Sequence, residues 1–331
     1  MILLYSYIFS LSLGIVLFLS GCSSDRLQTP GEGATTEAIL VPTVTASPAD
    51  LPPTPTVTPL LVETARDDLV LLPTVTPTPL PAIELQPTAT PNTSPMAIER
   101  LRARTYPSSD ILIGETLAPG VNYQRFIASY LSDGYRIYGL LTVPNGQVPE
   151  DGFPTILFLH GYVRPDTYQP TAQYVGSQDA LARSGFVTFK PDLRGHGRSE
   201  GIASGGLFSE AYTVDALNAI SALENYEPAD GNRVGLWGHS NGGATGLRVM
   251  TITDKVKAGV FWAGVVGSYP DLLETYYEDM PFMPLISRQV LADYGMPSEN
   301  PDYWLPIDPF AYLANVSEPI QLHHGTCLLY T

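Results

Sequence analysis

The chain of 331 residues contains only two cysteines, Cys22 and Cys327. No disulfide is expected within the folded part, so an apolar core must hold that part together. Basic residues are also scarce, with 17 Lys and Arg against 33 Asp and Glu and a formal net charge of −16. This balance argues against binding to nucleic acid and against attachment to anionic lipid by charge.

The first apolar run covers residues 2–19 and ends in Leu19-Ser20-Gly21-Cys22. This ending resembles the lipobox of bacterial lipoprotein precursors, which implies a signal peptide over residues 1–22 and a lipid on Cys22. We therefore expect an extracytoplasmic, membrane-anchored bacterial lipoprotein. The run has no Lys or Arg near Met1, which leaves the true start codon open. Its length of about 18 apolar residues also permits a plain transmembrane anchor.

Residues 23–105 are dominated by proline and threonine, as in Pro53-Thr54-Pro55-Thr56. Proline at this density removes backbone donors and favours extended conformations, so no sheet or long helix is expected here. The composition predicts a disordered linker between the N-terminus and a folded domain over residues 106–331.

Beyond the linker, strand-like and helix-like segments alternate, which is typical of an α/β fold with a mostly parallel sheet flanked by helices. The turn Ser132-Asp133-Gly134 predicts a hairpin between aromatic and β-branched strands. We expect strands over residues 123–131, 135–143, 155–159, 186–189, 233–237, 258–262 and 319–323, and helices over 173–183, 209–225 and 242–251.

The segment Gly238-His239-Ser240-Asn241-Gly242 matches the pattern G-x-S-x-G between a predicted strand and a predicted helix. In that context the pattern indicates a nucleophile elbow, which presents a serine hydroxyl on a sharp turn. The helix that follows directs backbone N–H groups to the place where an oxyanion forms during acyl transfer. The alternative is an ordinary glycine-rich turn.

Three motifs in this order resemble those of the α/β-hydrolase superfamily, and within it the prolyl-oligopeptidase-like serine peptidases and their esterase relatives. They are His160-Gly161-Tyr162, the loop from Asp192 to Ser199, and the segment from Gly238 to Gly243. The resemblance implies that Ser240 is the catalytic nucleophile. It also implies that the backbone N–H groups of Asn241 and Tyr162 form the oxyanion hole. No metal or organic cofactor is implied.

The other polar residues of these motifs are expected to have structural roles. Histidine beside glycine in a loop usually braces the backbone, and the family pattern places the general base at none of these three positions. We therefore expect His160, His196 and His239 to brace loops through hydrogen bonds. Asp192 and Arg194 are expected to tie their loop to its neighbours, and Asp215 to be a solvated or loop-bracing carboxylate.

Residues 267–310 form a long and unusually aromatic excursion after the predicted strand over 258–262. One interpretation is a cover over the serine, in which Glu274, Glu278 and Asp279 contact a cationic end of the substrate. The alternative is a packed helical excursion with a solvated acidic face.

The catalytic acid and histidine expected after Ser240 are not present in this chain. In the family the acid follows a strand ending in His-Gly-Thr, and this chain reads His324-Gly325-Thr326 and then Cys327-Leu328-Leu329-Tyr330-Thr331. These last five residues match the translation of a common transposon-based sequencing adapter. We therefore expect an incomplete hydrolase domain that lacks its last strand and helices and is inactive as it stands.

The sequence thus predicts a serine hydrolase that forms an acyl-enzyme on Ser240 and acts on a small peptide or ester substrate. A serine-type peptidase is favoured by the family resemblance. A carboxylesterase of the same fold stays open, as does a non-catalytic surface lipoprotein with a dead hydrolase site.

Overall fold

The computed structural model describes residues 94–275 and 283–325. The predicted signal peptide, the lipidation site Cys22 and nearly all of the predicted linker lie outside these ranges. None of the helices within the two ranges combines the length and apolar character needed to cross a lipid bilayer.

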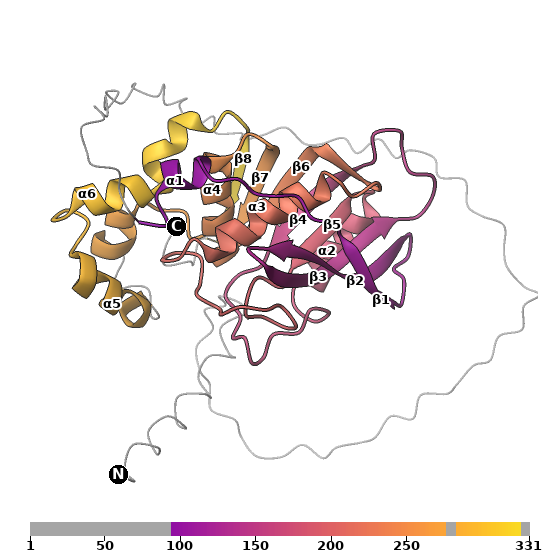
Figure 1. Ribbon diagram of the computed structural model, residues 1–331, viewed down its shortest axis with the longest axis horizontal. Coiled ribbons are helices and arrows are strands. Elements are labelled where there is room, and N and C mark those ends of the chain that lie inside the picture. Colours follow the sequence, from indigo (N-terminus) through magenta and orange to yellow (C-terminus); the bar gives the residue numbers. More distant parts are fainter. Residues whose placement is uncertain (1–93, 276–282, 326–331) are drawn as a thin grey trace, which may run out of the picture. The chain divides into compact units, whose positions relative to one another are not determined.

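A mixed sheet of eight strands, in the order β1-β2-β3-β5-β4-β6-β7-β8, forms the centre of the domain (Figure 1). Pairing is antiparallel from β1 to β3 and between β3 and β5, and parallel from β5 through β4, β6 and β7 to β8. The mostly parallel sheet confirms the predicted fold class. The strands are β1 (Leu112–Leu117), β2 (Tyr123–Ser132), β3 (Tyr135–Pro144), β4 (Phe153–Leu159), β5 (Val187–Pro191), β6 (Ala229–His239), β7 (Val256–Trp262) and β8 (Ile320–His323).

The hairpin between β2 and β3 closes at the predicted place. Ser132 pairs with Tyr135, and the two residues between them, Asp133 and Gly134, have φ angles of 53° and 81°. Two consecutive positive φ angles are the requirement of the type I′ turn, which Asp-Gly satisfies with little strain.

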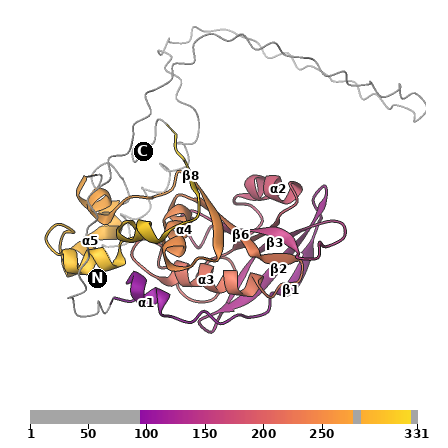
Figure 2. The same ribbon diagram turned by 90° about the horizontal axis from the view of Figure 1, so that it is seen from above.

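Helices cover both faces of the sheet. Figure 2 shows α2 (Val175–Arg183) on the face opposite α1 (Ile98–Arg102) and α3 (Ala211–Leu223). α4 (Asn241–Ile252) packs against α3 and against β6 and β7. Every residue of α3 is buried, because the helix lies between the sheet and its neighbours. The three helices predicted from the sequence are thus confirmed, with ends shifted by one or two residues.

The described chain begins before the predicted domain boundary at residue 106. α1 falls inside the segment expected to be linker, yet Ile98 and Leu101 are fully buried and the helix packs against α4. Arg102 donates from Nε to the carbonyl of Thr251 at the end of α4 (2.9 Å). The folded domain therefore includes the residues from 94 onward.

A second apolar cluster lies beside the main core and joins distant parts of the chain. Met96 meets Ala244 of α4 and the aromatic residues Tyr269 and Trp304 there. Within it, the buried guanidinium of Arg248 donates to the carbonyls of Met96 and Ile307, 152 and 59 positions away along the chain, and to Tyr269 Oη.

The aromatic excursion after β7 is a series of short helices. They are a π-helix (Asp271–Thr275), α5 (Met283–Tyr294), α6 (Pro301–Trp304) and two 3-10 helices (Leu305–Ile307 and Pro309–Asn315). Trp304 is buried, and its Nε1–H donates to the carbonyl of Gly295 (3.1 Å). Glu274 accepts a hydrogen bond from the backbone N–H of Ser298 (2.6 Å). These contacts favour the packed excursion, while Glu278 and Asp279 lie outside the described residues.

Candidate active site

Ser240 occupies the sharp turn between β6 and α4. Its φ and ψ angles are 52° and −118°, a conformation that costs a non-glycine residue of order 1–3 kcal/mol. Four backbone hydrogen bonds hold it in place. Its N–H donates to the carbonyl of Trp262 (3.1 Å), and its own carbonyl accepts from Gly243 (2.9 Å), Val265 (3.1 Å) and Ala244 (3.4 Å). This is the geometry of a nucleophile elbow.

Close backbone packing explains the glycines around the serine. A Cβ atom on Gly242 would lie 2.1 Å from the carbonyl oxygen of Leu159 at the end of β4. A Cβ atom on Gly238 would lie 2.6 Å from the carbonyl oxygen of Gly242 itself. The elbow is therefore pressed against the end of the neighbouring strand, from which the loop carrying Tyr162 departs.

Two backbone donors flank this contact. Asn241 is the first residue of α4, and Tyr162 lies in the exposed loop after β4, with 69% of its surface accessible. Among the residues that the structure describes, neither N–H donates to a protein acceptor. The N-terminus of a helix also favours negative charge. Both N–H groups thus have no protein acceptor within the described residues.

His160 orients the peptide group that carries one of these donors. Burial lowers the pKa of His160 to about 3, so the imidazole is neutral at pH 7. Its Nδ1 lies 2.7 Å from the carbonyl oxygen of Gly161, to which it must donate because a carbonyl only accepts. In a trans peptide the C=O and N–H point in opposite directions, so the N–H of Tyr162 is directed away from His160.

His196 and His239 also contact the loops around the serine. His196 lies with Nε2 3.0 Å from the carbonyl of Val163 and Nδ1 3.3 Å from that of Leu193, and so joins the loops after β4 and β5. His239 has its Nδ1 2.9 Å from the hydroxyl of Tyr174. The hydrogen bonds of all three motif histidines confirm the expected bracing role.

Asp192 and Lys190, at the end of β5, hold the loop between β4 and α2 through buried hydrogen bonds. Asp192 is fully buried and accepts from the hydroxyl of Tyr168 (2.7 Å), and burial raises the pKa of its carboxyl to about 6. Lys190 is also fully buried and donates from Nζ to the carbonyls of Pro170 (2.8 Å) and Gln173 (2.7 Å). Burial lowers the pKa of the Lys190 ammonium to about 8. Sequence reasoning did not identify Lys190.

Arg194 and Asp215 form an ion pair that fixes the loop after β5. Arg194 donates from Nη2 to Asp215 Oδ1 (2.6 Å) and from its backbone N–H to Oδ2 (2.9 Å). The Ser132 hydroxyl donates to the same carboxylate (2.7 Å). Asp215 is fully buried, so of the two expected roles the loop-bracing one is correct.

A general base for Ser240 is not found among these contacts. The chain has five histidines, and within residues 94–275 and 283–325 none is hydrogen-bonded to Ser240 Oγ. His323 instead stacks on Trp262, with ring centroids 4.1 Å apart and planes inclined by 4°. No group of three His, Cys, Asp or Glu side chains in the same ranges is placed to hold a metal ion.

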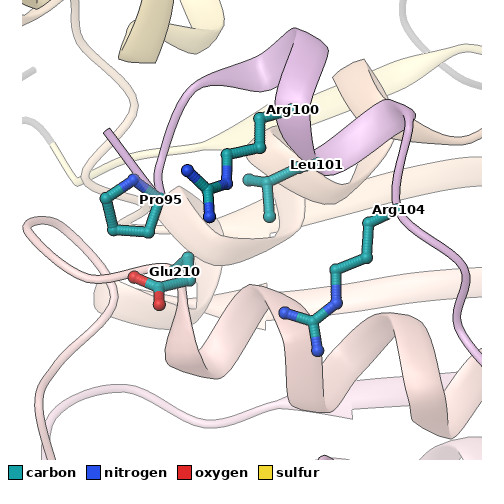
Figure 3. Close-up of a pocket in the computed structure, with 5 residues that line it drawn as sticks. All are labelled: Pro95, Arg100, Leu101, Arg104 and Glu210. Carbon is teal, nitrogen blue, oxygen red and sulfur yellow. The ribbon is translucent and has the colours of Figure 1, made fainter. Parts of the chain in front are cut away.

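A cavity of about 350 Å³ lies between α1 and the start of α3, away from the elbow (Figure 3). The residues that line it are Pro95, Arg100, Leu101, Arg104 and Glu210. None of them belongs to the elbow or to the loop after β4, so this cavity is not part of the site around Ser240.

Solved structures of two other proteins share the fold. One is the acetyl xylan esterase from Paenibacillus sp. R4, with a TM-score of 0.52 and 15% identity, covering 70% of this chain and 86% of that one. The other is the Pyrococcus horikoshii acylaminoacyl peptidase, with a TM-score of 0.51 and 24% identity, covering 61% of this chain and 32% of that one.

Two sequences from Bacillus subtilis are also similar. The chain is 27% identical to the uncharacterized peptidase YtmA over 209 residues, which are 63% of this chain and 75% of YtmA. It is 30% identical to the putative esterase YitV over 134 residues, which are 38% of this chain and about half, 49%, of YitV. The sequence profile of the Alpha/beta hydrolase family matches residues 156–329, more than half of the chain. With the elbow and the mostly parallel sheet, this match shows that the chain belongs to the alpha/beta hydrolase family.

Proposed function

We propose that Ser240 is the nucleophile of a serine hydrolase. The observation that carries the proposal is the strained backbone of Ser240 at the start of α4, together with the N–H groups of Asn241 and Tyr162, which donate to no acceptor within the described part of the chain. Strain of this kind persists only where the surrounding structure enforces it, and it concentrates at functional sites.

The proposed reaction is acyl transfer in two steps. Ser240 Oγ bonds to the carbonyl carbon of the substrate while a general base takes its proton, and the carbonyl oxygen gains a negative charge. The N–H groups of Asn241 and Tyr162 stabilise that oxygen, and each such donor is worth about 100- to 1,000-fold in rate. The leaving group departs with the proton, and water then hydrolyses the acyl-enzyme. We assign the base to none of the described histidines.

A peptide is the favoured substrate, and a simple ester is the alternative. YtmA, which is named as a peptidase, aligns over three quarters of its own length, at 75%. YitV, which is named as a putative esterase, aligns over 49% of its length. Both reactions use the same nucleophile and oxyanion donors, so the arrangement around Ser240 serves either.

Labelling with a fluorophosphonate probe tests the nucleophile. The complete gene product, Ser240→Ala and Ser209→Ala are treated in parallel, and the labelled peptide is identified by mass spectrometry. We expect the label on Ser240 in the natural protein and in S209A, and no label in S240A. Absence of label in the natural protein, or label on another residue, would instead favour a non-catalytic protein with a hydrolase fold.

Matched substrates then separate the two reactions. Aminoacyl p-nitroanilides and p-nitrophenyl esters with the same acyl groups are compared by kcat/KM. Cleavage of the anilides by the natural protein and not by S240A supports the peptidase. Turnover of the esters alone assigns a carboxylesterase.

A further inference from the structure

Tyr174 connects the loop after β4 to the residue before Ser240. Its hydroxyl oxygen accepts from the backbone N–H of Gly161 (3.0 Å) and lies 2.9 Å from Nδ1 of His239. A phenol has a single hydrogen, and the N–H of Gly161 uses an oxygen lone pair. The hydrogen bond to His239 Nδ1 uses either the hydroxyl hydrogen or the second lone pair, according to the tautomer of the imidazole. We call this pair of hydrogen bonds the Tyr174 tie.

The backbone at Tyr174 has a strained conformation where these contacts form. Its φ and ψ angles of 61° and 13° are left-handed, and they occur directly before the first residue of α2. The ring packs on Phe158 of β4 and Trp237 of β6, with centroids 5.6 and 6.2 Å away. Tyr174 thus lies against the two strands whose ends lead to Tyr162 and to Ser240.

Glycine at position 161 makes room for the tie. A Cβ atom there would lie 2.7 Å from the Tyr174 hydroxyl and 2.9 Å from Nδ1 of His239, closer than real Cβ contacts. Burial raises the pKa of Tyr174, so its hydroxyl stays protonated and able to donate at neutral pH.

We propose that Tyr174 is a positioning residue for acyl transfer. The tie holds the His160–Gly161 peptide against the elbow and so fixes the peptide that follows it, whose N–H belongs to Tyr162. In this way the N–H groups of Tyr162 and Asn241 converge on one oxygen. This inference rests on the proposed function and extends it, because Tyr174 touches neither the substrate nor Ser240 in this role. Without the tie both N–H groups remain, but the N–H of Tyr162 is no longer held in its orientation toward the oxyanion.

Tyr174→Phe removes the tie and keeps the ring. In the complete gene product we expect kcat to fall about 10- to 100-fold with KM changed by less than about twofold, because the donors act on the transition state more than on bound substrate. A trifluoromethyl ketone that carries the same acyl group places its adduct oxygen in the oxyanion hole. Its inhibition constant should rise by the same factor as kcat/KM falls.

Tyr168→Phe is the matched control. It removes another buried phenol hydroxyl from the same loop, one that is bonded to Asp192 and not to Gly161 or His239. We expect a lower melting temperature and a kcat within about twofold of the natural value. An unchanged kcat in Y174F, or an equal loss of kcat in Y168F, overturns the positioning role of Tyr174. Wild-type turnover in S240A overturns the proposed function instead.

A second pair of variants tests the tie from its other end, which keeps it testable if Y174F does not fold. His239→Ala removes the partner of the Tyr174 hydroxyl, and His239→Asn restores one, because the Asn amide can both donate and accept a hydrogen bond at the position of Nδ1. We expect kcat to fall in H239A and to recover in H239N. Equal rates in the two variants contradict the inference.

Discussion

Arg194 and Asp215 show how single buried charges shape the loops around the elbow. Their side chains are 12% and 0% exposed, and the carboxylate also accepts from Ser132 and from the backbone of Arg194. Removing one partner of such a pair leaves the other charge poorly solvated, which costs more than the pair itself contributes.

Asp215→Asn is therefore expected to lower the free energy of unfolding by on the order of 3 kcal/mol. Asp133→Asn is the control, because Asp133 is 28% exposed and lies 3.6 Å from the same Arg194. Asn keeps the left-handed turn, so D133N should cost less than about 1 kcal/mol. Urea unfolding measures both variants. Equal losses would show that burial does not set the strength of the pair.

The sequence motifs predicted the elbow and the bracing role of the histidines, but not the tyrosine that contacts His239. Tyr174 fell inside the helix predicted over 173–183, whereas in the structure it lies just before α2 with a left-handed backbone, and its partners are 13 and 65 positions away. The role of Lys190 was likewise not predicted, since a lysine in a strand does not indicate that it will donate to two carbonyl groups of another loop.

At the scale of elements, apolar runs predicted the buried strands well. β4 and β5 were found because strands covered on both faces are continuously apolar. β7 and the end of β6 were found from their apolar runs, although buried and partly exposed residues alternate along them. β1 was missed because five of its six residues are exposed, so it has no alternating pattern. α1 was missed because five residues are too few for helical periodicity, and a proline-rich stretch precedes them.

The contact between the elbow and β4 gives an element-scale prediction. Gly242→Ala would place a methyl group 2.1 Å from the carbonyl oxygen of Leu159. Because that oxygen belongs to the backbone, it cannot move aside as the end of a side chain would. We expect a loss of about 1–3 kcal/mol in unfolding free energy together with loss of probe labelling at Ser240.

Gly176→Ala is the control for that substitution. Gly176 is exposed in α2 with no atom within 4 Å of its potential Cβ, so alanine should raise stability by up to about 1 kcal/mol. Thermal unfolding checks both variants. A G242A protein that is as stable and as reactive as the natural one would show that the two strand ends are not in tight contact.

At the scale of the whole molecule, we propose that a lipid on Cys22 anchors the hydrolase to a membrane. Ser24→Ala, two positions along the chain, supplies the control. In a bacterial host grown with an alkyne fatty acid, the natural protein and Ser24→Ala should carry the label and sediment with membranes. Cys22→Ser should do neither. Label retained in C22S would refute the anchor.

The hydrogen bonds of the Arg248 guanidinium can form only late in the synthesis of the chain. It holds Met96 and Ile307, which leave the ribosome far apart in time. At about 5 to 20 residues per second, the 152 positions between Met96 and Arg248 alone take roughly 10 to 30 seconds to synthesise. The first helix therefore has no partner while it emerges, and the second cluster closes only after translation has passed β7. Until then its apolar residues have no partners to pack against.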